Sequence, residues 1–230
     1  MVDQKRTLIL LPDRNHIRRD WSGAFLPEAL SFAKTHDRDI IDMVSIDVSK
    51  AFWKRRWQTL RAIRKTPASQ PLSMVAIFCH GWKSGIQLGF RSRRQCRRLA
   101  QHIARESYPD VTVALYACST ARDADARIRD DLQPGPGGDG GFADTLRDEL
   151  VRAGAIHAGV YAHVTKGHAT RNPYVRLFAD GRFDGGDWLI EPGSDMWRRW
   201  RRALRETGLR FRFPMMSVDE IRAELNRGRR

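Results

Sequence analysis

The fold is decided by two short apolar runs, Met74-Val75-Ala76-Ile77-Phe78-Cys79 and Val111-Thr112-Val113-Ala114-Leu115-Tyr116-Ala117. Both are rich in apolar and β-branched residues, and a helical pattern lies between them, which is typical of buried strands in a parallel sheet. The first run leads into His80-Gly81 and the second into Cys118-Ser119. Because parallel strands end at one edge of the sheet, where open α/β sheets bind ligands, we expect His80 and Cys118 to lie side by side there.

The rest of the chain continues the alternation of strands and helices. Strand patterns occupy residues 6–11, 40–48, 156–164 and 174–178, and helical patterns occupy 27–34, 49–64, 91–107 and 142–153. This order predicts an α/β fold, a three-layer sandwich with a mainly parallel sheet. We expect Ser49 to cap the start of the second helix and Gly154 to close the last. One domain is expected over 1–195, followed by a basic Arg/Trp-rich segment over 196–230.

The chain is strongly basic, with a formal net charge of +14. Residues 197–230 contain 11 arginines and 4 acidic residues, so this segment carries +7, half of the total. Such a segment is a candidate for binding nucleic acid or an acidic partner. Of the 41 basic residues, 7 are lysines, which leaves 34 arginines. An arginine bias this strong is equally typical of a GC-rich genome.

Several classes of protein are excluded by composition. No apolar stretch approaches the roughly 20 residues that span a bilayer, and the N-terminus lacks the pattern of a signal peptide. The chain has three cysteines, Cys79, Cys96 and Cys118. Their odd number and wide spacing match neither a disulfide framework nor a zinc site, so we expect neither. We therefore predict a cytoplasmic protein that acts without metal or cofactor and does not bind a membrane.

The residues at the two strand ends suit nucleophilic chemistry. A cysteine thiolate is a good nucleophile, and a neighbouring histidine can take its proton, which assigns these roles to Cys118 and His80. Gly81 lets the backbone turn sharply and leaves its N–H uncovered. That N–H and the N–H of Cys118 are candidates for an oxyanion hole.

An apolar strand ending in His-Gly, followed by one ending in Ala-Cys, resembles the caspase–gingipain–legumain clan of cysteine peptidases. The His-to-Cys offset of 38 positions (118 − 80) accommodates one intervening helix. The segment Gly140–Ala155 is similar to the helix that follows the catalytic cysteine in bacterial caspase-like domains. The resemblance covers about residues 5–180. It implies a caspase-like peptidase domain over 1–195, with His80 as general base or acid, Cys118 as nucleophile and Gly81 as oxyanion donor.

The same resemblance implies where a substrate would bind. Tyr116, two residues before the nucleophile, would line the pocket for the substrate side chain, together with the loop that holds Asp13, Arg14 and His16. Caspases have glutamine at the position of Tyr116, in a Q-A-C-R/Q/G-G pattern that this chain lacks, so the preferred residue stays open. The loop over residues 119–141 lies where caspases are cut during activation, which suggests self-cleavage.

The resemblance predicts a hydrolase, an intracellular cysteine endopeptidase acting on a protein substrate. The alternative is a catalytically inactive caspase-like scaffold that binds nucleic acid or an acidic partner through its basic surface. An α/β-hydrolase is improbable because no G-x-S-x-G motif is present.

Other conspicuous residues have ordinary explanations. Trp53, Trp57, Trp197 and Trp200 recur at helical spacing, so we expect packing rather than base stacking. Cys79 alternates to the opposite side of its strand from His80 and is expected in the core. The arginine run over residues 91–98 is expected to form a solvated helix face.

Overall fold

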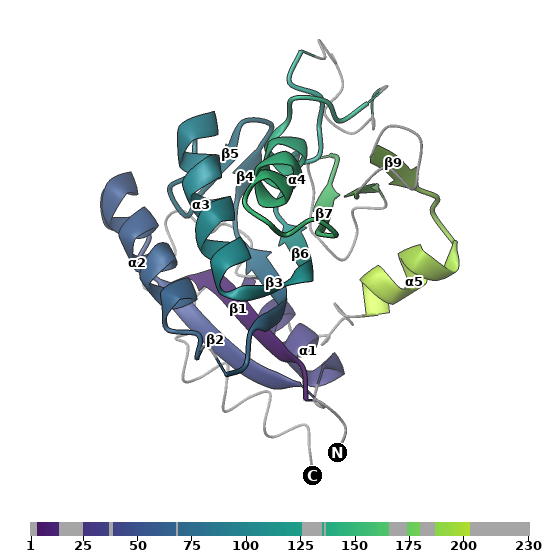
Figure 1. Cartoon of the computed structure of the whole chain (residues 1–230). Helices are drawn as coiled ribbons and strands as arrows, with labels where there is room; N and C mark the ends of the chain where they lie inside the picture. Colours follow the sequence, from purple (N-terminus) through teal and green to yellow (C-terminus); the bar gives the residue numbers. More distant parts are fainter. Residues whose placement is uncertain are drawn as a thin grey trace.

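A twisted sheet of seven strands forms the centre of the computed structural model (Figure 1). The structure describes residues 4–13, 25–36, 39–67, 69–125, 135, 137–165, 174–179 and 187–202. The strand order is β2-β1-β3-β6-β7-β8-β9. The parallel strands are β1 (Arg6–Pro12), β2 (Ile40–Ile46), β3 (Leu72–Phe78), β6 (Ser107–Tyr116) and β7 (Gly159–His163). β8 (Val175–Phe178) pairs antiparallel with β7, and β9 (Asp187–Ile190) pairs antiparallel with β8.

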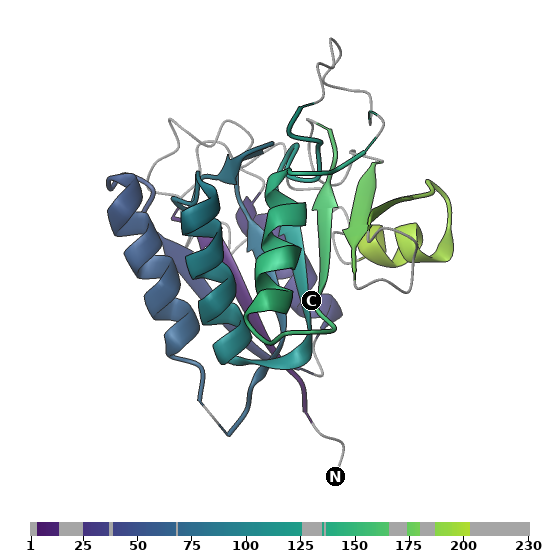
Figure 2. The same cartoon turned by 45° about the horizontal axis from the view of Figure 1, so that its top comes forward.

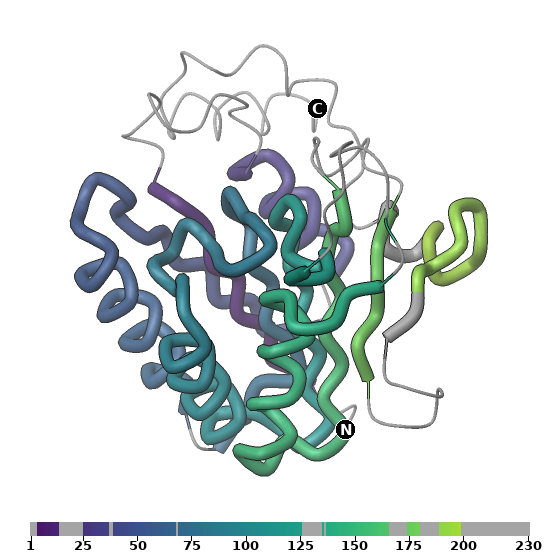
Figure 3. The backbone as a smooth tube through the Cα atoms, turned by 90° about the horizontal axis from the view of Figure 1, so that it is seen from above, coloured from purple at the N-terminus to yellow at the C-terminus, as the bar shows by residue number. Residues whose placement is uncertain are grey.

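Helices cover both faces of this sheet. They are α1 (Phe25–Thr35), α2 (Phe52–Arg64), α3 (Arg93–Arg105), α4 (Phe142–Arg152) and α5 (Asp195–Arg202). α2, α3 and α4 lie side by side along one face, and α1 lies on the other (Figures 2 and 3). The predicted three-layer α/β sandwich with a mainly parallel sheet is therefore confirmed.

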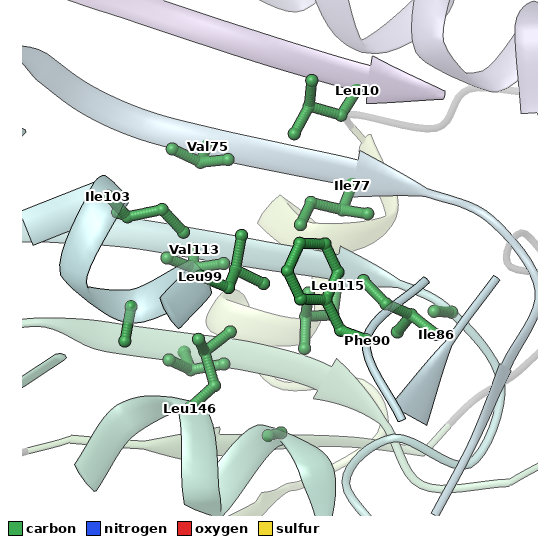
Figure 4. Packing of buried hydrophobic residues seen from close by; sticks show 14 of the residues in the cluster. Leu10, Val75, Ile77, Ile86, Phe90, Leu99, Ile103, Val113, Leu115 and Leu146 are labelled. Atoms are coloured by element: carbon green, nitrogen blue, oxygen red, sulfur yellow. The ribbon is translucent and has the colours of Figure 1, made fainter. Parts of the chain in front are cut away.

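The central strands are apolar toward their carboxyl ends because side chains there alternate between two buried faces. Val75, Ile77 and Leu115 pack on the side of α2–α4 with Leu99 and Leu146 (Figure 4). The residues between them in sequence, including Ala76, Phe78 and Tyr116, pack on the side of α1 around Phe32. Each central strand thus stabilises two hydrophobic layers at once.

A buried carboxylate joins α3 to α4. The Glu149 side chain is 2% exposed and lies 2.9 Å from both Arg97 Nε and Arg152 Nη1 and 3.5 Å from Arg93 Nε. Burial alone raises the pKa of a carboxyl, but the hydrogen bonds and charges of Arg97 and Arg152 outweigh it and leave the pKa of Glu149 below its ordinary value. The ion pairs fix the two helices beside each other.

The helix ends follow one of the two expectations. Gly154 adopts a φ of +104° after Ala153, the C-cap of α4, as a glycine that closes a helix does. The Ser49 cap is wrong, because α2 begins at Phe52 after Ala51. The Ser49 N–H instead donates to Asp47 Oδ1 over 2.9 Å, which folds this segment into a turn.

Some elements were not expected from the sequence. β4 (Gly81–Trp82) and β5 (Gly85–Ile86) form a small hairpin directly after His80. Of the predicted basic segment, the structure describes α5 but not residues 203–230, so the division after residue 195 stays a prediction. Within the described residues, no helix is both long enough and apolar enough to cross a bilayer.

Candidate functional site at the carboxyl edge of the sheet

His80 and Cys118 follow two neighbouring strands at the same level. Phe78 pairs with Tyr116 at the ends of β3 and β6, and the Cys79 N–H extends the pairing by donating to the Tyr116 carbonyl over 3.4 Å. His80 and Cys118 each come two residues after that last pair. The strand order reverses between β1 and β3, and ligands of open α/β sheets bind at the carboxyl ends beside such a reversal.

The His80 side chain belongs to the α1 face of the sheet. Phe78 packs on that face, and residues two apart along an extended chain point the same way, which assigns His80 to it as well. The Phe25 ring, at the start of α1, meets the His80 ring edge-on with 4.9 Å between centroids. Cys79 is buried in the cluster on the opposite face, as expected from the alternation.

Gln87 holds the backbone of His80 at two points. The His80 N–H donates to Gln87 Oε1 over 3.2 Å, and the Gln87 N–H donates to the His80 carbonyl over 2.9 Å. Buried Arg55 of α2 donates from Nη1 to the Gln87 carbonyl over 3.1 Å. The histidine is therefore anchored from the hairpin and from α2, so its position does not depend on strand pairing alone.

The chain turns sharply after Cys118. Ser119 has a φ of +58°, in the left-handed region that side-chain-bearing residues seldom occupy. Its N–H donates to the Thr165 carbonyl over 3.2 Å, and Thr120 Oγ1 donates to the Ala117 carbonyl over 2.9 Å. Backbone conformations of this kind cost about 1–3 kcal/mol and concentrate at functional sites. The turn sets Cys118 at the edge of the sheet.

Gly81 brings the two segments into direct contact. A Cβ atom on this residue would lie 2.7 Å from the Cys118 carbonyl oxygen, 2.7 Å from Thr120 Cγ2 and 2.8 Å from Ala117 Cβ. Only glycine fits so close to a neighbouring backbone. Gly81 pairs with Ile86 in the hairpin. The His80 carbonyl accepts a hydrogen bond from the Gln87 N–H, so Gly81 and Ile86 form a non-hydrogen-bonded pair of the hairpin. The Gly81 N–H therefore makes no hydrogen bond across the hairpin.

Tyr116, predicted to contact a substrate, lies in the core on the α1 face. It is 3% exposed, and its ring stacks on Phe78 with 4.5 Å between centroids. Burial, and then the nearby Glu28 carboxylate, raise the pKa of Tyr116 well above its ordinary value. A contact between this side chain and a bound molecule stays a prediction.

Asp13 is half-buried directly after β1, where its N–H donates to the Ile46 carbonyl over 2.6 Å. Leu10 of β1 pairs with Ile77 of β3, and three further positions along each strand lead to Asp13 and His80. Asp13 thus follows the strand beside that of His80 at the same edge, and its predicted role in binding stays a prediction. Arg14 and His16 lie outside the described residues.

The three thiols differ in access to solvent. Cys118 is partly exposed, whereas Cys79 and Cys96 are buried. Burial raises the pKa of Cys79 to about 12, although the backbone N–H groups of Gln87 and Leu88 partly offset this effect. Burial likewise raises the pKa of Cys96, and the Glu149 charge adds to the rise. A thiol must ionise to react, so Cys79 and Cys96 are inert near neutral pH.

Two residues that contact His80, Phe25 and Gln87, were not predicted from the sequence. Phe25 lies before the helix predicted over residues 27–34, and nothing in the surrounding sequence relates it to His80. Gln87 left a weak signal, since it is a polar residue between apolar Ile86 and Leu88 in a segment that contains Gly85 and Gly89. A buried polar side chain in such a segment usually has a specific hydrogen-bonding partner.

Metal sites and nucleotide sites each have characteristic side-chain patterns. No group of three or more His, Cys, Asp or Glu side chains in the described part of the chain is arranged to hold a metal ion. The segment after β1 reads Pro12-Asp13-Arg14-Asn15-His16 and lacks the glycine-rich fingerprint that binds dinucleotides in open α/β sheets.

Comparisons with known proteins return weak structural likeness. No protein-family model matches the chain, and no curated protein is similar to it in sequence. Among solved structures, a short-chain dehydrogenase/reductase from Serratia marcescens is 11% identical over 70% of this chain and 73% of its own, with a TM-score of 0.34. A doubly substituted Serratia marcescens short-chain dehydrogenase/reductase is 9% identical over 66% and 69%, with a TM-score of 0.30. At these values the likeness assigns neither a family nor a cofactor.

The same comparison corrects the prediction of family and function. No family model or curated protein of the caspase-like clan matches the chain, and no caspase-like peptidase is among the matching structures, so the caspase-like resemblance and the cysteine endopeptidase and hydrolase activity inferred from it are wrong. The alternative of an inactive caspase-like scaffold depended on the same resemblance and is not supported either. The physical reason is that His-Gly and Ala-Cys are short motifs, and any parallel sheet brings the ends of neighbouring strands together. What remains is the site itself, which does not depend on a family.

Proposed function

We propose that the edge formed by His80, Gly81 and Cys118 is a reactive-thiol site that accepts acyl groups. Cys118 is the nucleophile, and His80 takes the proton from its thiol. The observation that carries this proposal is the close approach of Gly81 to Cys118, with 2.7 Å between the Gly81 Cβ position and the Cys118 carbonyl oxygen. Endoproteolysis forms no part of it.

The chemistry is the addition of a thiolate to an activated carbonyl. The Cys118 sulfur forms a bond to the carbonyl carbon of an ester or thioester, and the bond from that carbon to the leaving group breaks. The leaving group departs with the proton that His80 took from the thiol. The N–H groups of Gly81 and Cys118 are proposed to stabilise the negative charge that develops on the carbonyl oxygen, a role worth about 10²–10³-fold in rate per donor.

The surroundings of the two residues support this assignment. Gln87 and Phe25 fix the backbone and the ring of His80, so little reorientation is needed before it accepts a proton. Cys118 is the partly exposed thiol among buried ones. A reducing cytoplasm, the compartment expected from the sequence, would keep its sulfur in the thiol form.

Acetylation by p-nitrophenyl acetate tests the proposal. We expect one acetyl group per chain on Cys118, seen by intact mass and by peptide mapping, with release of one equivalent of p-nitrophenolate. Cys118→Ala removes the fast phase, and His80→Gln slows it at least about tenfold, since proton transfer contributes about 10²–10⁴-fold in enzymes. An adduct that forms equally fast in Cys118→Ala contradicts the proposal. Cys79 and Cys96 serve as internal controls in every sample.

A further inference from the structure

Positive charge is concentrated in one continuous part of the chain. Between Asp47 and Glu106 there are 14 Lys and Arg residues and no Asp or Glu, so this segment alone equals the net charge of the whole chain. It contains α2 and α3, which lie next to each other on the face of the sheet opposite α1 (Figure 2). The His80 ring packs against Phe25 of α1 on the other face, so the basic face is a separate surface from the one that holds this ring.

Only part of this charge is neutralised by acidic neighbours. On α3, Arg93 and Arg97 pair with Glu149. On α2, the solvent-facing cations are Lys54, Arg61, Arg64 and Lys65, and no ion pair to any of them occurs within the described part of the chain. As far as the described residues go, the outer side of α2 therefore presents a line of cations without acidic neighbours.

Two tryptophans lie among these cations, and the expectation that they pack in the core is wrong. Trp53 is 59% exposed and Trp57 is 52% exposed. They are four residues apart on α2, which separates them by about 6 Å along the helix axis. Lys54 Nζ lies 5.2 Å from the centroid of the Trp53 ring, and the Arg61 guanidinium lies 5.1 Å from that of Trp57. Two half-exposed indoles with adjacent cations make a surface on which aromatic rings can stack.

A groove runs beside the second tryptophan. It has a volume of about 310 Å³, with Trp57, Arg61 and Lys65 on one wall and Val44 and Ile46 of β2 on the other. β2 is the edge strand of the seven-stranded sheet. The groove thus combines an aromatic ring, two cations and apolar residues of β2, and its volume falls within the range of small-ligand pockets.

We propose that this α2 face, formed by Trp53, Trp57, Arg61, Arg64 and Lys65, binds single-stranded nucleic acid. Bases stack on the two indoles, one base enters the groove beside Trp57, and the phosphates lie against the cations. An anionic membrane suits the face less well, because Ala62 and Ile63 of α2 are buried and Leu60 packs against the core, so few apolar side chains besides the indoles could enter a bilayer. A duplex suits it less well too, because its stacked bases leave the indoles without a partner.

Fluorescence anisotropy with a labelled oligothymidylate tests the proposal on the full chain. We expect Trp53→Ala/Trp57→Ala to bind at least about tenfold more weakly, since each stacked base contributes about fivefold or more and the variant loses two of them. Arg61→Ala should weaken binding and lower the dependence of affinity on salt by about one unit of slope. Tyr108→Ala is the matched control, because Tyr108 is a 40% exposed aromatic residue outside α2, and it should bind like the unchanged protein.

The alternatives give different results. Equal affinity of the double tryptophan variant and the unchanged protein overturns the proposal, and the basic segment over 196–230 then accounts for any binding. If the protein binds phosphatidylserine vesicles more tightly than the oligonucleotide, and this binding depends on the tryptophans, the face binds membranes and the proposal is overturned. Equal affinity for duplex and single-stranded oligonucleotide also overturns the proposal. Because both indoles are exposed, we expect the variants to fold, and Trp53→Phe/Trp57→Phe, which keeps two stacking rings, should restore most of the affinity.

Discussion

Gly81→Ala is expected to destabilise the protein by about 3 kcal/mol, at the upper end of what overpacking costs. The added methyl group would lie 2.7 Å from a backbone oxygen, that of Cys118, and within 2.8 Å of Thr120 Cγ2 and Ala117 Cβ. A backbone atom cannot move aside as the end of a flexible side chain can, so β3 and β6 must separate where they end. The free energy of unfolding in urea measures the loss.

Gly159→Ala is the matched control for this substitution. Gly159 begins β7, and the nearest atom to its Cβ position is Leu177 Cδ1 at 3.7 Å, an ordinary contact distance. Removing backbone freedom from the unfolded chain should leave stability unchanged or raise it by up to about 1 kcal/mol. If both variants lose the same stability, Gly81 does not mark a close approach of the two strand ends. Gly81→Ala should also slow acetylation of Cys118, which Gly159→Ala should leave unchanged.

Alkaline pH is expected to unfold the protein through its buried thiols. The pKa of Cys79 is raised from 9.0 to about 12 by burial, and that of Cys96 is raised by burial as well. Below about pH 9 both thiols are protonated in the folded and the unfolded chain, and their contribution to stability is complete. Above that pH only the unfolded chain releases the protons, so the free energy of unfolding falls by about 1.4 kcal/mol per pH unit for each thiol.

The loss between pH 9 and 11 amounts to roughly 5 kcal/mol for the two thiols together. Urea unfolding at a series of pH values measures it, and Cys79→Ala/Cys96→Ala should make the dependence on pH clearly shallower. Ile77→Val is the control, because Ile77 is buried in the same cluster and does not titrate. It should lower stability by about 0.5–1.5 kcal/mol at every pH with the slope unchanged. Identical slopes in all three proteins would show that the thiols are not held neutral by burial.

The sheet and its carboxyl edge could be predicted because the central strands are buried on both faces. A strand of this kind must be apolar throughout, so the runs before His80 and Cys118 are visible in the sequence, and parallel connectivity then brings their ends together. The hairpin β4–β5 could not be predicted, because its strands have two residues each and no periodicity. The anchoring of His80 by Gln87 therefore also escaped the sequence analysis.

α2 shows why helical spacing alone misjudged the tryptophans. Its buried side includes Arg55 and Thr59, whereas Trp53 and Trp57 face solvent. Arg55 is buried because its guanidinium donates to the Lys50 and Gln87 carbonyls, the second of which is 32 residues away. No local pattern reveals such a distant partner, so hydrophobicity assigned the wrong face to the core.

The rate at which iodoacetamide alkylates Cys118, followed peptide by peptide across a range of pH, tests the reactive-thiol site most directly. At pH 7 we expect Cys118 to react far faster than Cys79 and Cys96, and His80→Asn to slow Cys118 at least about tenfold, with the difference narrowing at alkaline pH where hydroxide removes the proton. His157→Asn, at an exposed histidine before β7, should react like the unchanged protein. Equal rates for Cys118 in the unchanged protein and in His80→Asn at pH 7 would contradict the site.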